Sequence, residues 1–232
     1  MAVCGEDIKV RKTKLDSMKT RQLLIDTAIQ EFARRGVSST TLTDIADAAH
    51  VTRGAIYWHF SSKAELFNEI WKQQVELKEE IAVNNMTEDD SDPLTALRQK
   101  LITLLKAVAT DPKYRALMEI LYHKCEFTED MITECEIKDI TCFDRQSMAA
   151  ALQRCIDSGQ ISATLNINVA IILLQSCLNG IISDWLSQPD SFNLFSLVDI
   201  LVDNMLKMIL AEPQQKQTEQ SRRHRSVNQA YI

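Results

Sequence analysis

The sequence predicts an all-α protein with an N-terminal three-helix, helix-turn-helix domain and a larger C-terminal helical domain. Only 5 of its 232 residues are Gly and 4 are Pro, and 45% are hydrophobic, a composition that suits long helices. Apolar residues recur at helical spacing, and no stretch alternates apolar and polar residues as a strand does. Two short, capped helices stand close together in residues 41–60. These observations together give the fold class.

The chain begins with a basic arm, residues 1–15, that we expect to be disordered. A first helix is predicted over residues 16–35, with Leu24, Ala28 and Phe32 on its inner face and Gly36 ending it. The cations near its start suit contact with phosphate, the alternative being a solvated tail; they are Lys9, Arg11, Lys12, Lys14, Lys19 and Arg21.

The helix-turn-helix is expected between residues 41 and 60. Thr41 can cap the first helix with Asp44 as its partner three residues later, and Thr52 can cap the second. His50 lies in the turn between them, where a left-handed residue is needed and His is tolerated. The second helix is short and carries four large polar or aromatic side chains, which suit a surface that touches a partner: Arg53, Tyr57, Trp58 and His59.

A long helix then links the two domains. Ser62 and Glu65 form a second expected capping box, and the helix runs to about residue 85. The acidic run Glu88–Asp92, followed by Pro93, ends it.

The boundary falls near residue 78, giving domains of residues 16–78 and 79–211. Residues 212–232 are polar and Gln-rich with a basic cluster, and we expect a disordered tail. The C-terminal domain should contain helices at about residues 93–110, from 112 onward, 128–158, 166–187 and 191–211.

The last two helices are very apolar. Ile171, Leu174, Leu178 and Ile182, with their neighbours, cover most of the circumference of helix 166–187, and such a helix must be covered on both sides. One cover is the domain itself, and we take the other to be a second copy, with a four-helix bundle across a two-fold axis. The alternative is a wholly intramolecular core.

Charge is distributed unevenly along the chain. Its net value is −6, but residues 1–60 carry nine Lys and Arg against seven Asp and Glu, whereas residues 61–211 carry 13 against 23. A basic end on an acidic body favours a nucleic-acid-facing N-terminus. No signal peptide is expected, residues 167–186 make a poor membrane span, and the six scattered cysteines suit a reduced, cytoplasmic protein.

The stretch VTRGAIYWHF followed by SSKAELF resembles the signature of the TetR family of bacterial transcriptional repressors, with Tyr57, His59, Phe60 and Lys63 in place. EILYHKCEF (119–127) and RKTK (11–14) resemble the AcrR-type regulators of multidrug efflux within that family. His50 departs from the Gly that many relatives carry in the turn. The likeness covers about residues 11–211.

This resemblance implies a dimer that binds double-stranded DNA at a near-palindromic operator. Arg53 suits guanine readout, or else a phosphate, and Thr, Gly and Lys residues suit phosphate contact. The expected DNA-binding residues are Thr41, Thr43, Thr52, Arg53, Gly54, Tyr57, Trp58, His59 and Lys63.

The resemblance also implies a cavity for bulky amphiphilic effectors. Aromatic faces and a carboxylate favour a cation, although core packing is the plain alternative for each aromatic, and Glu119 and His123 can simply pair on a helix. The candidate ligand-binding residues are Trp71, Glu119, Tyr122, His123, Glu126, Phe127, Gln175 and Trp185.

The resemblance implies a repressor of a multidrug efflux operon that amphiphilic drug-like ligands release from its operator. We expect no cofactor, metal or membrane partner. Glu119, His123 and Cys125 offer metal ligands but lack zinc spacing. Redox sensing by Cys125 or Cys142 has no visible activating cluster. The alternative function is an enzyme or carrier built on a helical scaffold. The sequence does not support it, because it contains no nucleophile elbow, P-loop, dinucleotide fingerprint or HExxH motif.

Overall fold

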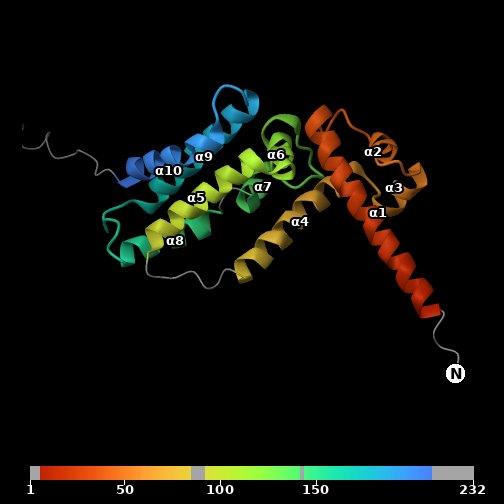
Figure 1. Cartoon of the computed structure of the whole chain (residues 1–232), viewed down its shortest axis with the longest axis horizontal. Helices are drawn as coiled ribbons and strands as arrows, with labels where there is room; N and C mark the ends of the chain where they lie inside the picture. Colours follow the sequence, from red (N-terminus) through yellow and green to blue (C-terminus); the bar gives the residue numbers. More distant parts are fainter. Residues whose placement is uncertain (1–5, 85–91, 142–143, 211–232) are drawn as a thin grey trace, which may run out of the picture.

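The computed structural model describes residues 6–84, 92–141 and 144–210, and these ranges contain helices and no strand, as predicted (Figure 1). The head consists of α1 (Glu6–Arg35), α2 (Leu42–Ala48), α3 (Arg53–His59) and α4 (Lys63–Asn84). The body consists of α5 (Pro93–Thr110), α6 (Pro112–Glu119), the π-helical turn η1 (Ile120–Lys124), α7 (Glu134–Thr141), α8 (Arg145–Asp157), α9 (Ile167–Ser187) and α10 (Leu194–Leu210).

The first helix is longer than the sequence predicted. α1 begins at Glu6, so the expectation of disorder is wrong for residues 6–15, while residues 1–5 lie outside the described ranges. The segment 6–15 contains no Gly or Pro, so no strong helix breaker interrupts it. α1 consequently projects well beyond the rest of the head (Figure 1).

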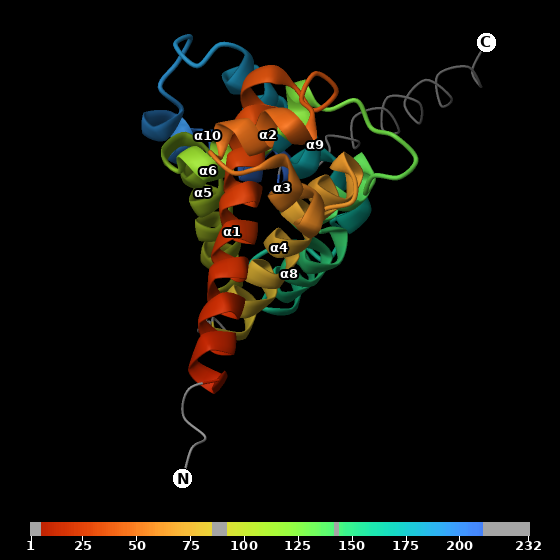
Figure 2. The same ribbon diagram turned by 90° about the vertical axis from the view of Figure 1, so that its right-hand side faces the viewer.

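The head is held together by one face of α1. Leu24, Ala28 and Phe32 are fully buried, as predicted. Figure 2 shows α2, α3 and α4 gathered along α1, and α1 contacts all three. The ring of Phe67 from α4 lies 6.4 Å from that of Phe32, between ring centroids, so the long linking helix shares the core of the head.

The second capping box is half right. Ser62 Oγ accepts a hydrogen bond from the Glu65 N–H at 3.0 Å, as expected of a cap. The Glu65 carboxylate, however, accepts from the N–H of Ser61 at 2.7 Å rather than from Ser62. The sequence offers two adjacent serines, and the reciprocal bond is made to the earlier one.

One predicted helix of the body proved to be two. Instead of a helix over residues 128–158, α7 and α8 are separate. Each has its own cap: the Thr133 N–H donates to Glu136 at 2.9 Å, and the Ser147 N–H donates to Asp144 at 2.6 Å. Capping residues favour the start of a helix even inside a continuous helical pattern, and Thr133 and Asp144 each start a new helix within the predicted one. The bounds of α5 and the Asn166 cap of α9 agree with the predictions.

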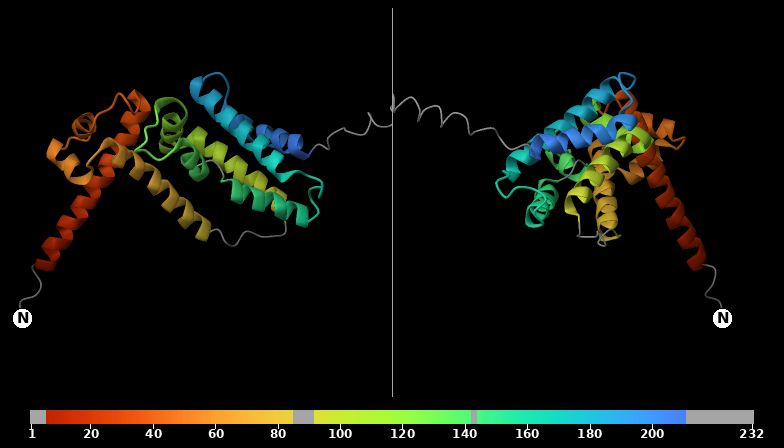
Figure 3. Two further views of the ribbon diagram at one scale, coloured as in Figure 1. Left: turned by 180° about the vertical axis from the view of Figure 1, so that it is seen from behind. Right: turned by 60° about the vertical axis from the view of Figure 1, so that its left-hand side comes forward.

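The body's helices lie side by side, with α10 against α5 and α9, and α9 also against α8 and α6 (Figure 3). α9 is long and apolar enough to cross a membrane by length and composition, and it is the one such helix in the described part of the chain. Its packing instead places Ala170, Leu174, Leu178 and Ile182 in the core. Its opposite face, and one face of α10, remain exposed.

Candidate nucleic-acid interface and head–body cleft

The helix-turn-helix is fixed by local hydrogen bonds. Thr41 Oγ1 accepts from the Asp44 N–H at 3.1 Å, and Asp44 Oδ2 accepts from the Thr41 N–H at 2.8 Å, which confirms the capping box. The side-chain and backbone hydrogen bonds from Thr41 lower the pKa of Asp44 below its ordinary value. The carboxylate is therefore ionised at neutral pH, at the N-terminal end of α2 where the helix dipole favours it.

The turn between α2 and α3 also has the predicted form. His50 has a φ of 55°, in the left-handed region, and the Val51 N–H donates to the carbonyl of Ala46 at 3.0 Å. Thr52 caps α3, because its Oγ1 accepts from the Ala55 N–H at 3.2 Å. The direction in which α3 leaves α2 is thus set by backbone geometry and one hydroxyl.

α3 is anchored on one side and open on the other. Ile56 is fully buried, whereas Tyr57 is 55% exposed and Trp58 73% exposed. Neither aromatic packs the helix inward, and Phe60 takes the core position at 1% exposure. The face that α3 presents to solvent therefore combines two large aromatic groups with the guanidinium of Arg53, which is exposed and forms no ion pair among the described residues.

The other predicted DNA contacts differ in how available they are. Thr52 and Gly54 are exposed, and Thr43 is half-buried on α2. His59 is half-buried beside Trp58, with ring centroids 4.7 Å apart. Burial, and then the positive charge of Arg21, lower the pKa of His59 below its ordinary value. His59 is therefore neutral at pH 7 and would meet DNA as a hydrogen-bonding group rather than as a cation.

Two cations assigned to phosphate from sequence brace the head. Lys63 Nζ donates to the carbonyl oxygens of Val37 at 2.6 Å and Ser38 at 3.2 Å, in the loop between α1 and α2. Arg21 pairs with Glu69 at 2.8 Å and lies 4.9 Å from the ring centroid of Phe60. These are long-range contacts, which the spacing of residues could not reveal. An ammonium has three donors, so phosphate contact by Lys63 stays a prediction.

The head and the body are joined by specific backbone contacts besides α4. The Val37 N–H, just after α1, donates to the carbonyl of Lys124 in η1 at 2.8 Å. On α4, Asn68 accepts from the Ile132 N–H at 2.7 Å and donates to the Asp130 carbonyl at 3.1 Å. η1 is therefore bonded to the residue that follows α1, and the loop between η1 and α7 is bonded to α4.

The predicted effector residues occur at several places in the described structure. Trp71 is fully buried, in an aromatic cluster with Phe67 and Phe127, and its indole N–H has no acceptor among the described residues. The Tyr122 hydroxyl donates to Asn179 on α9 at 2.6 Å. The others lie apart, with Glu126 exposed, Gln175 bonded to Arg145 at 3.4 Å, and Trp185 beside a hollow of about 320 Å³ at the α9–α10 turn.

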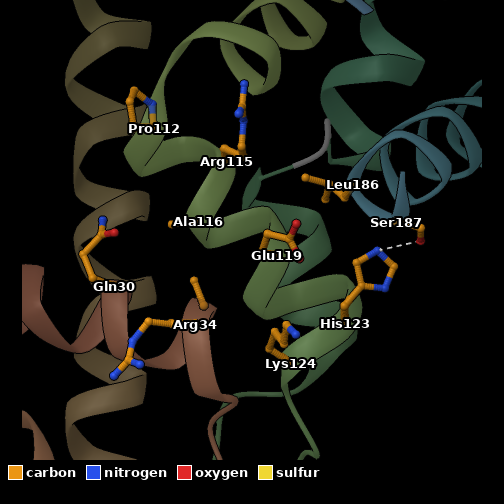
Figure 4. A pocket seen from close by; sticks show the side chains of 11 residues that line it. Gln30, Arg34, Pro112, Arg115, Ala116, Glu119, His123, Lys124, Leu186 and Ser187 are labelled. Atoms are coloured by element: carbon orange, nitrogen blue, oxygen red, sulfur yellow. Dashed lines mark hydrogen bonds between the residues drawn. The ribbon is translucent and has the colours of Figure 1, made fainter. Parts of the chain in front are cut away.

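Glu119 and His123, by contrast, share a cleft of about 540 Å³ where the head meets the body (Figure 4). Its walls come from α1, α6, η1 and the end of α9. Its polar residues are Gln30, Arg34, Arg115, Glu119, His123, Lys124 and Ser187. Sequence reasoning missed the contributions of α1 and of Lys124, because only the tertiary fold brings α1 against α6 and η1.

His123 also ties η1 to α9. Its Nε2 lies 3.2 Å from the Ser183 carbonyl oxygen and 3.4 Å from the Ser187 hydroxyl. It therefore does not pair with Glu119, which was the plain alternative for these two residues. Burial is the main cause that raises the pKa of the neighbouring Cys125 thiol to about 11, which leaves little thiolate for redox chemistry.

Two family models match this chain. Residues 24–70 match the model described as bacterial regulatory proteins, tetR family, and residues 92–211 match the model described as MAATS-type transcriptional repressor, C-terminal region. The two matches correspond to the head and to the body.

Individual proteins are similar over most of their length. The probable acrEF/envCD operon repressor of Escherichia coli strain K12 is 44% identical over 202 residues, covering 87% of this chain and 92% of that protein. The crystal structure of NalD, the secondary repressor of the MexAB-OprM multidrug efflux pump in Pseudomonas aeruginosa, has a TM-score of 0.69 at 31% identity, covering 85% of this chain and 99% of NalD. A complex of SmeT with triclosan has a TM-score of 0.69 at 26% identity, covering 84% and 93%.

Proposed function

This chain belongs to the TetR family of bacterial regulatory proteins, and from that premise we propose that it is a dimeric repressor of a multidrug efflux operon, released from its operator by amphiphilic drug-like ligands. The names of its relatives support the target, because NalD is a repressor of an efflux pump and the Escherichia coli relative is a probable operon repressor. Such a regulator acts on DNA in the bacterial cytoplasm, without a membrane partner or a cofactor.

The observation that carries the proposal is the outward face of α3 on a locally fixed helix-turn-helix. Tyr57 and Trp58 are more than half exposed, beside the exposed Arg53, at the tip of the head. A helix of this kind enters the major groove and presents its N-terminal residues to base edges, so Arg53 at the first position is the base-reading candidate. We expect Thr41, Thr43, Thr52, Gly54 and Lys63 to contact the flanking phosphates.

Dimerisation is supported by aliphatic side chains that the body leaves uncovered. Ile172 on α9 is 51% exposed and Ile200 on α10 is 59% exposed, with other apolar residues on the same two helices: Val169, Leu173, Phe195, Leu197 and Met208. Contiguous exposed apolar surface marks an interface. We place the two-fold axis on α9 and α10, so that two heads meet half-sites about one helical turn apart, roughly 34–36 Å.

Release by a ligand needs a route from the body to the head. α4 runs from the head core to its end at Asn84 and carries Trp71, whose buried N–H lacks an acceptor in the described ranges. Buried polar groups usually have partners, so an acceptor on an effector suits this position. An effector there would shift α4, and with it the spacing of the two heads. Such couplings are typically about 1–3 kcal/mol.

The test begins by selecting the bound sequence from random duplex DNA, with a near-palindrome expected. Fluorescence polarisation then measures affinity for that sequence at several salt concentrations, and affinity should fall steeply as salt rises. Arg53→Ala should weaken binding by about 1–3 kcal/mol and relax base preference at one position in each half-site. Arg154→Ala, which removes an exposed arginine of α8, is the matched control. Full operator affinity in Arg53→Ala would contradict the assignment of α3.

A further inference from the structure

In the cleft between head and body, two opposite charges have no partner among the described residues. Glu119, the last residue of α6, and Lys124, the last residue of η1, both line it and are half-buried. Within the described ranges, neither side chain makes a hydrogen bond or an ion pair. Removing a charge from water is costly unless it gains a partner, so a ligand that pairs with these groups would stabilise both.

The other cations of the cleft are already engaged. Arg34 pairs with Glu31 at 2.6 Å. The Arg115 guanidinium donates to the carbonyl oxygens of Val108 and Ala109 and lies 4.6 Å from the Trp185 ring centroid. In Figure 4 both guanidinium groups point away from the middle of the cleft, whereas Glu119 projects into it. The charges available to a ligand are therefore one carboxylate and one ammonium.

Helix geometry places these two charges on one side. A π-helix bonds residue i to residue i+5, so residues five apart stand on neighbouring turns of the same face. Glu119 and Lys124 have this spacing across η1 and still do not form an ion pair. Ala116 and Leu186 give the cleft apolar walls beside them. The result is an apolar slot with a negative group and a positive group along one wall.

We propose that this cleft binds an amphoteric small molecule, whose compact apolar body carries a cationic amine against Glu119 and an acidic group against Lys124. A simple anion would leave Glu119 unpaired, and a simple cation would leave Lys124 unpaired. A molecule with both charges satisfies both side chains. The cleft is separate from the aromatic cluster around the buried Trp71, so it is a second site.

A ligand in this cleft would span head and body. α1 contributes one wall through Gln30 and Arg34, and the Lys124 carbonyl is bonded to the Val37 N–H of the head. Occupancy therefore biases the position of the head, and operator affinity changes with it. This second step rests on the proposed function. By linkage, operator DNA must change the affinity for the ligand by the same factor.

The binding test uses a charge-matched series on the full chain. The probe is 4-(aminomethyl)benzoate, compared with 4-methylbenzoate and 4-methylbenzylamine, each of which keeps the ring and removes one charge. Calorimetry at fixed ionic strength should find the zwitterion bound at least tenfold more tightly than either control. Glu119→Gln should reduce zwitterion affinity to about that of 4-methylbenzoate, and Lys124→Gln to about that of 4-methylbenzylamine. Glu129→Gln, an exposed carboxylate outside the cleft, should change nothing.

Equal affinity for the three probes, or zwitterion binding that survives both cleft substitutions, would overturn the site. Urea unfolding of each variant shows whether it is folded. The coupling is tested by measuring operator affinity with and without saturating probe, and probe affinity with and without operator. The coupling is supported if the probe changes operator affinity and the operator changes probe affinity by the same factor, different from one. It is overturned if bound probe leaves operator affinity unchanged. If the probe-free protein fails to bind operator at all, the proposed function fails, while calorimetry still decides the site.

Discussion

The head and the body leave different kinds of side chain uncovered. On α3 of the head the exposed large side chains are Arg53, Tyr57 and Trp58, which carry charge and hydrogen-bonding groups. On α9 and α10 of the body, large hydrophobic side chains such as Ile172 and Ile200 are more than half exposed. The first surface suits a charged, hydrated partner and the second a dry one. The two ends of the molecule should therefore respond independently to substitution.

The largest expected effect comes from the core that supports the polar surface. Phe32 is fully buried against Phe67, so Phe32→Ala should lower the free energy of unfolding by about 3–5 kcal/mol. Urea unfolding followed by circular dichroism measures this. Trp58→Ala on the same head should change stability by less than about 0.5 kcal/mol, because Trp58 is mostly exposed. If the two substitutions cost the same, the contrast between the buried and exposed aromatics of the head is wrong.

The double substitution Ile172→Asp and Ile200→Asp tests whether the exposed apolar surface of α9 and α10 is the dimer interface. Burying two carboxylates in a dimer interface should raise the dimer dissociation constant at least 100-fold, about 2.7 kcal/mol. Sedimentation velocity over a range of concentrations measures it. Leu15→Asp, at a residue of α1 that is 54% exposed, is the control and should leave the dimer intact. If the double variant dimerises as tightly as the parent, the two-fold axis does not lie on α9 and α10.

The two regions also differed in how far their sequence predicted their structure. The turn at His50 and the caps at Thr41 and Thr52 were predicted because each depends on residues within a few positions of one another. The break between α7 and α8 was missed although Asp144 is a cap of the same kind, because a helical pattern runs through it. Local signals predict a helix start when the flanking pattern also stops there.

Long-range partners were beyond the reach of spacing arguments. Arg21 was assigned to phosphate but pairs with Glu69, 48 residues later. Glu119 and His123 were named as ligand residues together with Trp71, yet they line the cleft against α1 while Trp71 lies in a closed aromatic cluster. The sequence identified residue types suited to ligand contact. Their division between sites depended on how α1 packs on α6 and η1.

A smaller effect is expected on the polar surface itself. Trp58→Ala should weaken operator binding about tenfold, or 1.4 kcal/mol, because it removes one hydrogen-bonding group and its apolar contact at the edge of the groove. Fluorescence polarisation with the selected operator measures this, with Arg154→Ala on the body as control. The dimer dissociation constant should not change. A Trp58→Ala variant that loses dimerisation would show that the two surfaces are not independent.

The smallest effect is expected at the turn between α2 and α3, which sets the direction of α3. His50 has a φ of 55°, and a left-handed conformation costs a residue with a side chain about 1–2 kcal/mol. His50→Gly removes that cost but adds backbone freedom to the unfolded chain, so the net gain should be about 0.5–1 kcal/mol, or about 1–4 °C in melting temperature. Differential scanning calorimetry measures it. The same change at Ala48, exposed at the end of α2, should instead cost up to about 1 kcal/mol, because Gly is a poor helix former. Were His50→Gly less stable than the parent, contacts of the imidazole would have to outweigh the strain, and His50 would then be a structural member of the head rather than a tolerated substitute for Gly.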